Sequence, residues 1–301
     1  MRTSPPSIPS SLRGVRALLP HEAFFALLFA GIMASLFAAG VRDRVLFLSF
    51  GSVLIVLLLL VVFCQLRPTA PRWRLRLLYY PLVTTPVYAL LPRVVSALGI
   101  PMKDDALQRI DGFLIGGDLS LRLQPFASPP LTDLLSAAYL FYLLYFGVSQ
   151  LVYLLDELEL AVRFYTGLFT VFALGFAGYV LVPALGPYLA FPDAFTVPLA
   201  GGLITRINDE AVRLGTIRTN VFPSLHLAVP AFILAFDYRY KRTRFWVCLV
   251  PCLLLFVSTI YLRYHYLVDL LAGVALALVA FALATRWIRP EEPASIVPGS
   301  P

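Results

Sequence analysis

Two short segments of this sequence bring histidine together with serine, and the second also contains an arginine and a carboxylate. The first is Phe222-Pro223-Ser224-Leu225-His226. Proline and serine suit the first turn of a helix, where free N–H groups and the positive end of the helix dipole can hold a phosphate oxygen. Ser224 adds a hydroxyl donor, and His226 lies two residues further on. This segment predicts an anion-binding helix start with a histidine beside it.

The second segment runs from Ser258 to Asp269 and pairs a histidine with a carboxylate. His265 and Asp269 are four residues apart, so on a helix they share one face and the carboxylate can accept a hydrogen bond from the imidazole. That contact fixes the tautomer and leaves the other ring nitrogen free as a nucleophile or base. Arg263 lies in the same segment, and an arginine can clamp the charge of a phosphate.

Each segment also has a simpler explanation. A lone histidine is commonly just a satisfied polar residue, and a His/Asp pair at this spacing can simply stabilise a helix. The sequence contains only three histidines, and we expect His21 to be an interface residue at the start of the first apolar run. Because His226 and His265 each have a serine and an arginine nearby, their combination favours a functional site.

Long apolar runs must position these two segments. The chain of 301 residues is 59% hydrophobic and only 14% charged, which excludes an ordinary soluble protein, since soluble domains carry ~25% charged residues. Eight runs are long enough and poor enough in charge to be membrane-spanning helices rather than strands. They lie at about 22–40, 45–64, 77–98, 131–155, 162–183, 222–238, 245–263 and 265–286.

The placement of the basic residues predicts how the chain crosses the membrane. A net charge of +7 could indicate a nucleic-acid partner, but the basic residues fall mainly in short segments between apolar runs. That placement is typical of the cytoplasmic side of a membrane protein, so we expect no nucleic-acid partner. Counting Arg and Lys in the loops places both termini in the cytoplasm. Both histidine segments then lie at the outer membrane boundary.

This reading divides the chain into four parts. They are a flexible cytoplasmic tail at 1–20, two amino-terminal transmembrane helices at 21–76, a catalytic transmembrane domain at 77–288 and a second flexible cytoplasmic tail at 289–301. Two outer segments, 99–130 and 184–221, are long enough to hold structure of their own. The mixed charges of the first predict a short interfacial helix that ends at a Gly116-Gly117 turn.

The two histidine segments resemble signatures of the type 2 phosphatidic acid phosphatase superfamily. The family's second signature, Pro-Ser-Gly-His, is similar to residues 223–226. Its third signature is Ser-Arg, five residues, His, three residues and Asp, and the sequence keeps these spacings in Ser258, His265 and Asp269. The first signature, a Lys, six residues and then Arg-Pro, is not present. Arg263 or Arg218, or less favourably Arg206 or Arg213, is therefore a candidate for the missing phosphate charge.

Two departures from these signatures point to one branch of the superfamily. Leu225 replaces the glycine of the second signature, and Thr259 replaces the arginine of the third. With Tyr264-His265-Tyr266-Leu267-Val268-Asp269, these residues look like the inositol phosphorylceramide synthase branch, which transfers head groups between lipids. The segment from Val182 to Tyr188 is similar to the proline-rich segment that closes a span in that branch.

The resemblance implies a fold and a reaction. The fold is an all-α polytopic membrane helical bundle, with a six-helix phosphatidic acid phosphatase-like core plus two amino-terminal spans. The implied reaction moves a phosphoryl head group, such as phosphoinositol, from a phospholipid donor to a lipid alcohol acceptor through a phosphohistidine. The implied catalytic residues are His265, Asp269 and His226, and the implied phosphate-binding residues are Ser224, Arg263, Arg218 and Ser258.

Other readings remain open beside this one. With water as the acceptor, the same site would make a lipid phosphate phosphatase acting on phosphatidic acid or polyprenyl phosphates. A non-enzymatic lipid transporter, with His and Asp along its path, is a third alternative. We expect no cofactor and no metal, and the oligomeric state is open. Short loops and a bias towards arginine favour a multi-pass protein of a bacterial inner membrane, with its active site on the extracytoplasmic face.

Overall fold

The computed structural model describes Leu12 and residues 18–286 of the chain. Within this part, helices and loops account for the whole backbone, and it contains no strand. The predicted tail at 289–301 lies outside the described residues, as does most of the predicted tail at 1–20.

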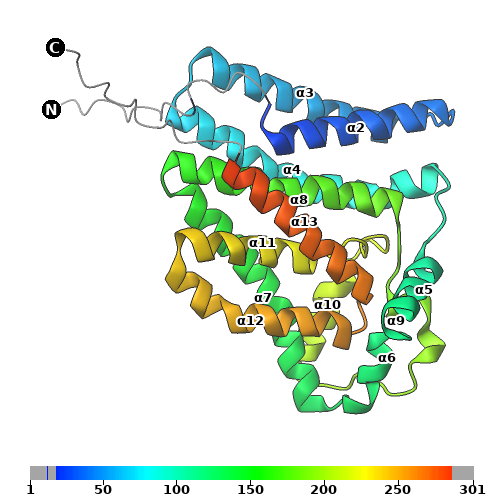
Figure 1. Cartoon of the computed structure of the whole chain (residues 1–301). Helices are drawn as coiled ribbons and strands as arrows, with labels where there is room; N and C mark the ends of the chain where they lie inside the picture. Colours follow the sequence, from blue (N-terminus) through cyan, green and yellow to red (C-terminus); the bar gives the residue numbers. More distant parts are fainter. Residues whose placement is uncertain (1–11, 13–17, 287–301) are drawn as a thin grey trace, which may run out of the picture.

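Eight long helices build a bundle, and shorter helices gather at one end of it (Figure 1). The long helices are α2 (Pro20–Ala38), α3 (Arg44–Leu66), α4 (Ala70–Ala97), α7 (Pro129–Leu154), α8 (Leu158–Leu181), α11 (Leu225–Tyr240), α12 (Arg242–Tyr261) and α13 (Leu267–Arg286). The shorter ones are α5 (Asp104–Ile115), α6 (Leu119–Leu123), η1 (Gln124–Phe126), α9 (Pro187–Ala190), η2 (Pro192–Ala194) and α10 (Leu203–Gly215). All eight predicted helices are therefore present.

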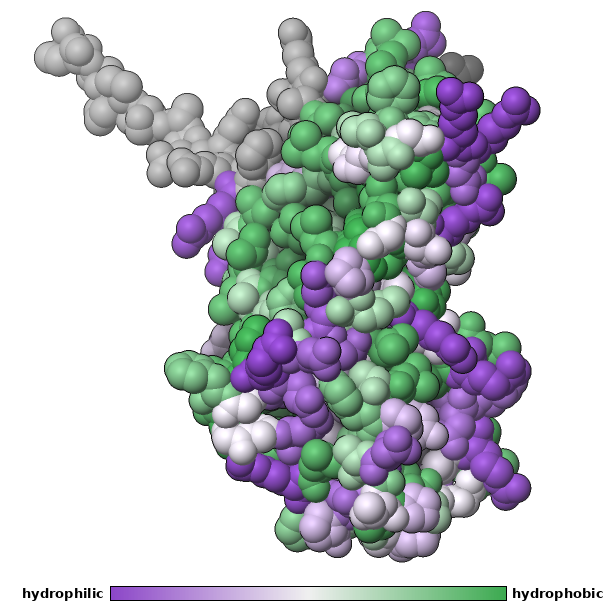
Figure 2. Space-filling model, turned by 90° about the vertical axis from the view of Figure 1, so that its right-hand side faces the viewer, coloured by the Kyte–Doolittle hydropathy of each residue, from purple (hydrophilic) through white to green (hydrophobic). Residues whose placement is uncertain are grey.

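Six of the long helices are long and apolar enough to cross a membrane: α2, α3, α7, α8, α12 and α13. Their outward faces carry exposed apolar side chains such as Leu48, Val247 and Leu278, as expected for contact with lipid. The described chain thus forms an all-α polytopic membrane bundle. Figure 2 shows that one end of this bundle mixes hydrophilic with hydrophobic residues.

Helices α4 and α11 do not meet the criteria for a span, in contrast to the prediction of eight spans. Basic residues at the start of α4 lower its apolar character. Helix α11 has only 16 residues and begins at Leu225, after the first residues of the predicted run. It contacts α7, α8, α12 and α13 and is buried along most of its length, so it lies among other helices rather than in lipid.

The two amino-terminal helices attach to the bundle through a buried ionic contact. Helix α2 packs on α8, and α3 packs on α4. The carboxylate of Glu22 forms an ion pair with Arg76 and accepts a hydrogen bond of 2.8 Å from the Tyr80 hydroxyl. His21 is fully buried, and its ring lies 4.4 Å from that of Tyr80. The prediction that His21 lies at the membrane interface is therefore wrong, because α4 covers its side chain.

The long helices alternate in direction, which places the two histidine segments at the same end (Figure 1). This is also the end that carries α5, α6, α9 and α10. The predicted short helix is present here as α5, and Gly116 follows its last residue, Ile115, with a φ of 75°, as suits the turn predicted at Gly116-Gly117. The turns between α3 and α4, α7 and α8, and α11 and α12 lie at the opposite end.

Candidate active site

His265 lies in the tight turn that joins α12 to α13. Helix α12 ends at Tyr261, and Arg263 then adopts a left-handed conformation with φ of 67°. The carbonyl of Thr259 accepts hydrogen bonds from the N–H groups of Tyr264 and His265, at 3.0 and 3.2 Å. Such bonds satisfy carbonyls that a helix end leaves free. The turn therefore holds the backbone of His265 against the end of α12.

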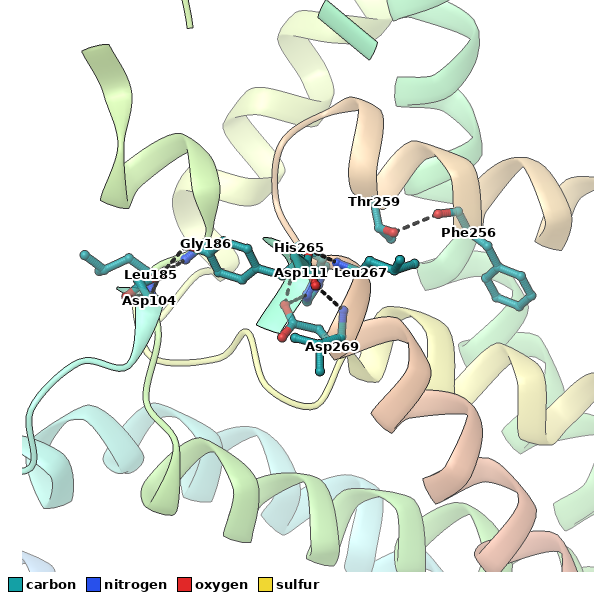
Figure 3. Close-up of polar contacts among 11 residues, drawn as sticks. Asp104, Asp111, Leu185, Gly186, Phe256, Thr259, His265, Leu267 and Asp269 are labelled. Atoms are coloured by element: carbon teal, nitrogen blue, oxygen red, sulfur yellow. Dashed lines mark hydrogen bonds and ion pairs between the residues drawn. The ribbon is translucent and has the colours of Figure 1, made fainter. Parts of the chain in front are cut away.

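His265 and Asp269 form the predicted pair, but not on one helix face. Helix α13 begins only at Leu267, so His265 precedes it while Asp269 lies in its first turn. The Asp269 carboxylate lies 3.4 Å from Nδ1 of His265 and accepts the N–H of Tyr266 at 2.9 Å (Figure 3). A carboxylate in the first turn that reaches back to the residue before the helix is half of a capping box. The spacing of four residues thus produces contact through a helix cap.

The His265 ring is neutral at physiological pH. His265 is 3% exposed, and burial lowers its pKa to about 4, with a hydrogen bond to the backbone of Val221 opposing the shift in part. The carboxylate beside Nδ1 favours the tautomer with its proton on that nitrogen, which would leave the lone pair of Nε2 for nucleophilic attack.

His226 lies in the first turn of α11 and faces the same space. Its ring centroid is 6.0 Å from that of His265. On α7, the rings of Tyr139 and Tyr142 lie 4.6 and 4.5 Å from the His226 ring and hold it from the side. The N–H of Ser224 donates to the backbone carbonyl of Asp269 at 3.1 Å, which ties the start of α11 to α13. The structure thus brings the two predicted segments together.

Two glycines permit the close approach of these backbones. A side chain at Gly273 on α13 would place its Cβ 2.8 Å from the carbonyl oxygen of Ser224. A Cβ at Gly186 would lie 2.4 Å from the carbonyl oxygen of Tyr264, and its φ of 86° also favours glycine. Gly186 belongs to the proline-rich segment after α8, which therefore packs directly against the His265 turn.

Two buried carboxylates of α5, which the sequence patterns did not indicate as site residues, lie against this turn. Asp104 accepts hydrogen bonds from the N–H groups of Leu185 and Gly186, and Asp111 accepts those of Leu267 and Val268 (Figure 3). Burial raises the pKa of Asp111, and the charge of Asp118 adds to that shift. The signal was present in the sequence, because a spacing of seven places both carboxylates on one face of the predicted helix.

Arg263 is a buried cation without a counterion. It is 3% exposed, its guanidinium lies 4.4 Å above the ring of Phe195, and it donates to the carbonyl of Val197 at 2.6 Å. Its Nε has no hydrogen-bond partner, and no carboxylate forms an ion pair with it in the described chain. Burial lowers the pKa of this guanidinium. A charge buried in this way is costly unless an anion compensates it.

The other predicted phosphate-binding residues differ in their surroundings. The Oγ of Ser224 is buried and has no partner, at a helix start whose first amides have no intrahelical acceptor. The Ser258 hydroxyl donates to the carbonyl of Leu255 at 2.7 Å and therefore contacts its own helix. Arg218 is exposed on the loop before α11, and Arg213 is paired with Glu210 at the surface. Neither arginine makes a contact with the histidines among the described residues.

The described residues contain no group of three or more His, Cys, Asp or Glu side chains that could hold a metal ion.

Comparison with known proteins gives one match. A family model described as the PAP2 superfamily matches residues 105–283, which is more than half of the chain. The matched region runs from α5 into α13 and includes both histidine segments. Neither a curated protein nor a solved structure matches the chain.

Proposed function

The chain belongs to the PAP2 superfamily of phosphatases and phosphotransferases, and we propose that it transfers a phosphoryl head group between membrane lipids through a phosphohistidine at His265. One observation carries this proposal. The rings of His226 and His265 lie 6.0 Å apart, and His265 is oriented by the carboxylate of Asp269. This separation leaves room for a reacting group about 3 Å from each ring.

In the first step, Nε2 of His265 attacks the phosphorus of the donor lipid. An N–P bond forms, and the P–O bond to the leaving lipid breaks. The leaving oxygen keeps the electron pair of that bond and takes a proton from His226, which the negative charge of the bound phosphate keeps protonated, so the first product departs as an alcohol. Asp269 stabilises the positive charge that develops on the His265 ring.

In the second step, the acceptor hydroxyl attacks the phosphohistidine. His226 takes the hydroxyl proton as the acceptor oxygen bonds to phosphorus. The N–P bond breaks, its electron pair returns to Nε2 of His265, and the phosphorylated acceptor leaves. Both histidines are then in their starting forms, so the cycle closes without any other reactant.

Arg263 and the start of α11 are suited to bind the phosphate oxygens. Arg263 is two residues from His265 and has no counterion among the described residues, so a phosphate would complete its charge. The Ser224 hydroxyl and the first amides of α11 add donors at the positive end of a helix. Donors that are fixed in advance around a developing charge commonly provide the largest part of catalysis. Ser258 and Arg218 have less support, for the reasons given above.

A lipid alcohol, rather than water, is the proposed acceptor. Leu225 and Thr259 depart from the superfamily signatures and resemble the inositol phosphorylceramide synthase branch, which transfers head groups. Phosphoinositol is one head group that fits such a transfer. Hydrolysis of phosphatidic acid or polyprenyl phosphates is the second candidate, since the same phosphohistidine could react with water. A non-enzymatic transporter is the third candidate, because transporters bind their substrates near mid-span, whereas the His265–Asp269 pair lies at the end of the bundle.

A screen of labelled lipids separates transfer from hydrolysis. The purified protein in vesicles is given phospholipids labelled in the head group, with and without ceramide or diacylglycerol. Transfer predicts that the label moves to the added lipid and that product depends on it, whereas hydrolysis predicts a water-soluble product without any acceptor. Turnover that survives in His265→Ala would contradict both enzymatic proposals. Absence of turnover with every lipid tested would favour the non-enzymatic transporter.

The site is proposed to face the outside of a bacterial inner membrane. The end of the bundle opposite the histidines carries basic residues such as Arg74, Lys241 and Arg242, and such residues gather on the cytoplasmic side. Thr196 is exposed at the end of the bundle that carries the histidines, and Glu157 is exposed in the turn between α7 and α8 at the opposite end. In intact cells, an impermeant maleimide should label Thr196→Cys but not Glu157→Cys, with wild-type protein as the background. The reverse pattern would invert the orientation.

A further inference from the structure

Helix α5 carries two buried carboxylates that the proposed reaction does not use. Asp104 is 6% exposed and Asp111 is fully buried, and neither forms an ion pair within the described residues. Both point from α5 into the backbone that surrounds His265 (Figure 3). A buried carboxylate is costly unless it is well hydrogen bonded, so each needs an explanation.

Asp111 caps α13 from a different helix. Its carboxylate accepts the N–H of Leu267 at 2.7 Å and that of Val268 at 2.9 Å. These are the first two amides of α13, which have no acceptor within their own helix. The residue before the helix normally provides the cap, but here that residue is Tyr266, whose hydroxyl donates to Asp104 instead. Asp111 thus provides the cap that the local sequence lacks.

Asp104 holds the residue between His265 and α13. It accepts the Tyr266 hydroxyl at 3.0 Å and the N–H of Gly186 at 2.9 Å. Gly186 in turn lies directly against the carbonyl of Tyr264, on the other side of His265. The two carboxylates therefore fix the backbone on both sides of His265 without touching its ring.

We infer that Asp111 is a positioning residue for His265: by capping α13 from α5, it fixes the turn in which His265 meets Asp269. The inference rests on the proposed function only in giving His265 a nucleophilic role. A displacement of about 1 Å in such a contact can cost about 100-fold in rate. Loss of the cap should thus affect the reaction itself while leaving substrate binding largely intact.

Asp111→Asn tests this, with Asp118→Asn as the matched control. Each carboxylate oxygen of Asp111 accepts a different amide, so asparagine would keep one acceptor, turn an NH2 donor towards the other N–H group and carry no charge. Asp118 is also a buried capping carboxylate of the same segment, but it accepts the N–H of Ser120 on α6. Asp111→Asn should lower kcat by about 10- to 100-fold with KM unchanged, while Asp118→Asn should stay close to wild type. Equal losses in both variants, matched by equal losses of thermal stability, would overturn the inference.

A measurement without substrate separates this inference from the proposed function. The chain has three histidines, so ¹⁵N-labelled imidazole signals in nanodiscs can be assigned individually by substitution. In the wild type, His265 should show one tautomer with the proton on Nδ1. Asp111→Asn should mix the tautomers of His265 and leave those of His21 and His226 unchanged. An unchanged His265 would overturn the positioning role, whereas a changed His265 in a protein without turnover would uphold it and count against the proposed reaction.

Discussion

Asp237 and Asp269 are both fully buried in the helical core, but their surroundings differ. Asp237, in the last turn of α11, accepts hydrogen bonds from the hydroxyls of Tyr153 at 2.5 Å and Tyr145 at 2.8 Å, and Arg244 lies 3.4 Å away. Asp269, in the first turn of α13, has one oxygen without a hydrogen-bond partner and faces His265 with the other.

Asp237 thus finds all its hydrogen-bond and charge partners within the protein, whereas Asp269 does not. At the Asp237 end, Lys241 and Asp156 form a further ion pair of 2.5 Å, which fastens the turn between α11 and α12 to that between α7 and α8. At the Asp269 end, Arg263 is buried without a carboxylate partner in the described chain. Because buried polar groups are nearly always paired, we read the first end as structural and the second as the end that meets a charged substrate.

The same substitution, Asp to Asn, should lower activity at Asp269 and stability at Asp237. The largest effect on activity is expected at Asp269. Asp269→Asn keeps the shape of the side chain but no longer stabilises the charged imidazole or fixes its tautomer. We expect kcat to fall by about 10⁴-fold, as in nucleophilic triads, with little change in thermal unfolding. A variant with more than a tenth of wild-type turnover would remove the distinction between the two carboxylates.

The uncompensated charge of Arg263 provides the next effect. Arg263→Gln removes the cation but retains a donor for the Val197 carbonyl. We expect the rate to fall by about 10²- to 10³-fold, since that is the range for one lost group that stabilises charge. The surface variant Arg213→Gln, on the same end of the molecule, should be unaffected. Equal effects in both variants would indicate a dependence on the net charge at this end of the molecule rather than a phosphate contact.

Asp237→Asn should damage stability instead of activity. It leaves Arg244 without its buried carboxylate, and removing one partner of a buried pair costs about 3–5 kcal/mol. Thermal unfolding in detergent should therefore shift to lower temperature, while turnover per folded molecule stays within about twofold of wild type. Adding Arg244→Gln should recover part of the loss, because the unpaired charge is then gone. Loss of activity in the still folded variant would contradict a purely structural role.

The acid limit of activity gives the smallest expected effect. The proposed nucleophile must be neutral, and the pKa of His265 is lowered to about 4 by burial. As the pH falls, kcat/KM should therefore decline only near pH 4, and not near the value of about 6.5 of an ordinary histidine. Asp237→Asn should show the same limit, because it lies at the other end. A decline centred near pH 6.5 would mean that His265 is not the buried, neutral group described here.

Local sequence patterns predicted the helices and the two histidine segments well. Apolar runs of about 20 residues indicate spans by their length, and the spacing of four between His265 and Asp269 brings two side chains together on a helix or across a helix start. The patterns failed where distant segments meet. His21 is buried because α4 packs over it, and Asp237 matters because Tyr145 and Tyr153 of α7 reach it. The division into a catalytic domain at 77–288 and two amino-terminal helices stays a prediction.

Trapping the phosphohistidine tests the central proposal most directly. Wild-type protein is incubated with a phospholipid labelled in the phosphoryl head group, without any acceptor, and the protein-bound label is mapped by mass spectrometry. The proposal predicts an acid-labile label on His265 that disappears when a lipid alcohol is added and is absent from His265→Ala. Turnover without label on His265, or label that persists in His265→Ala, would contradict it.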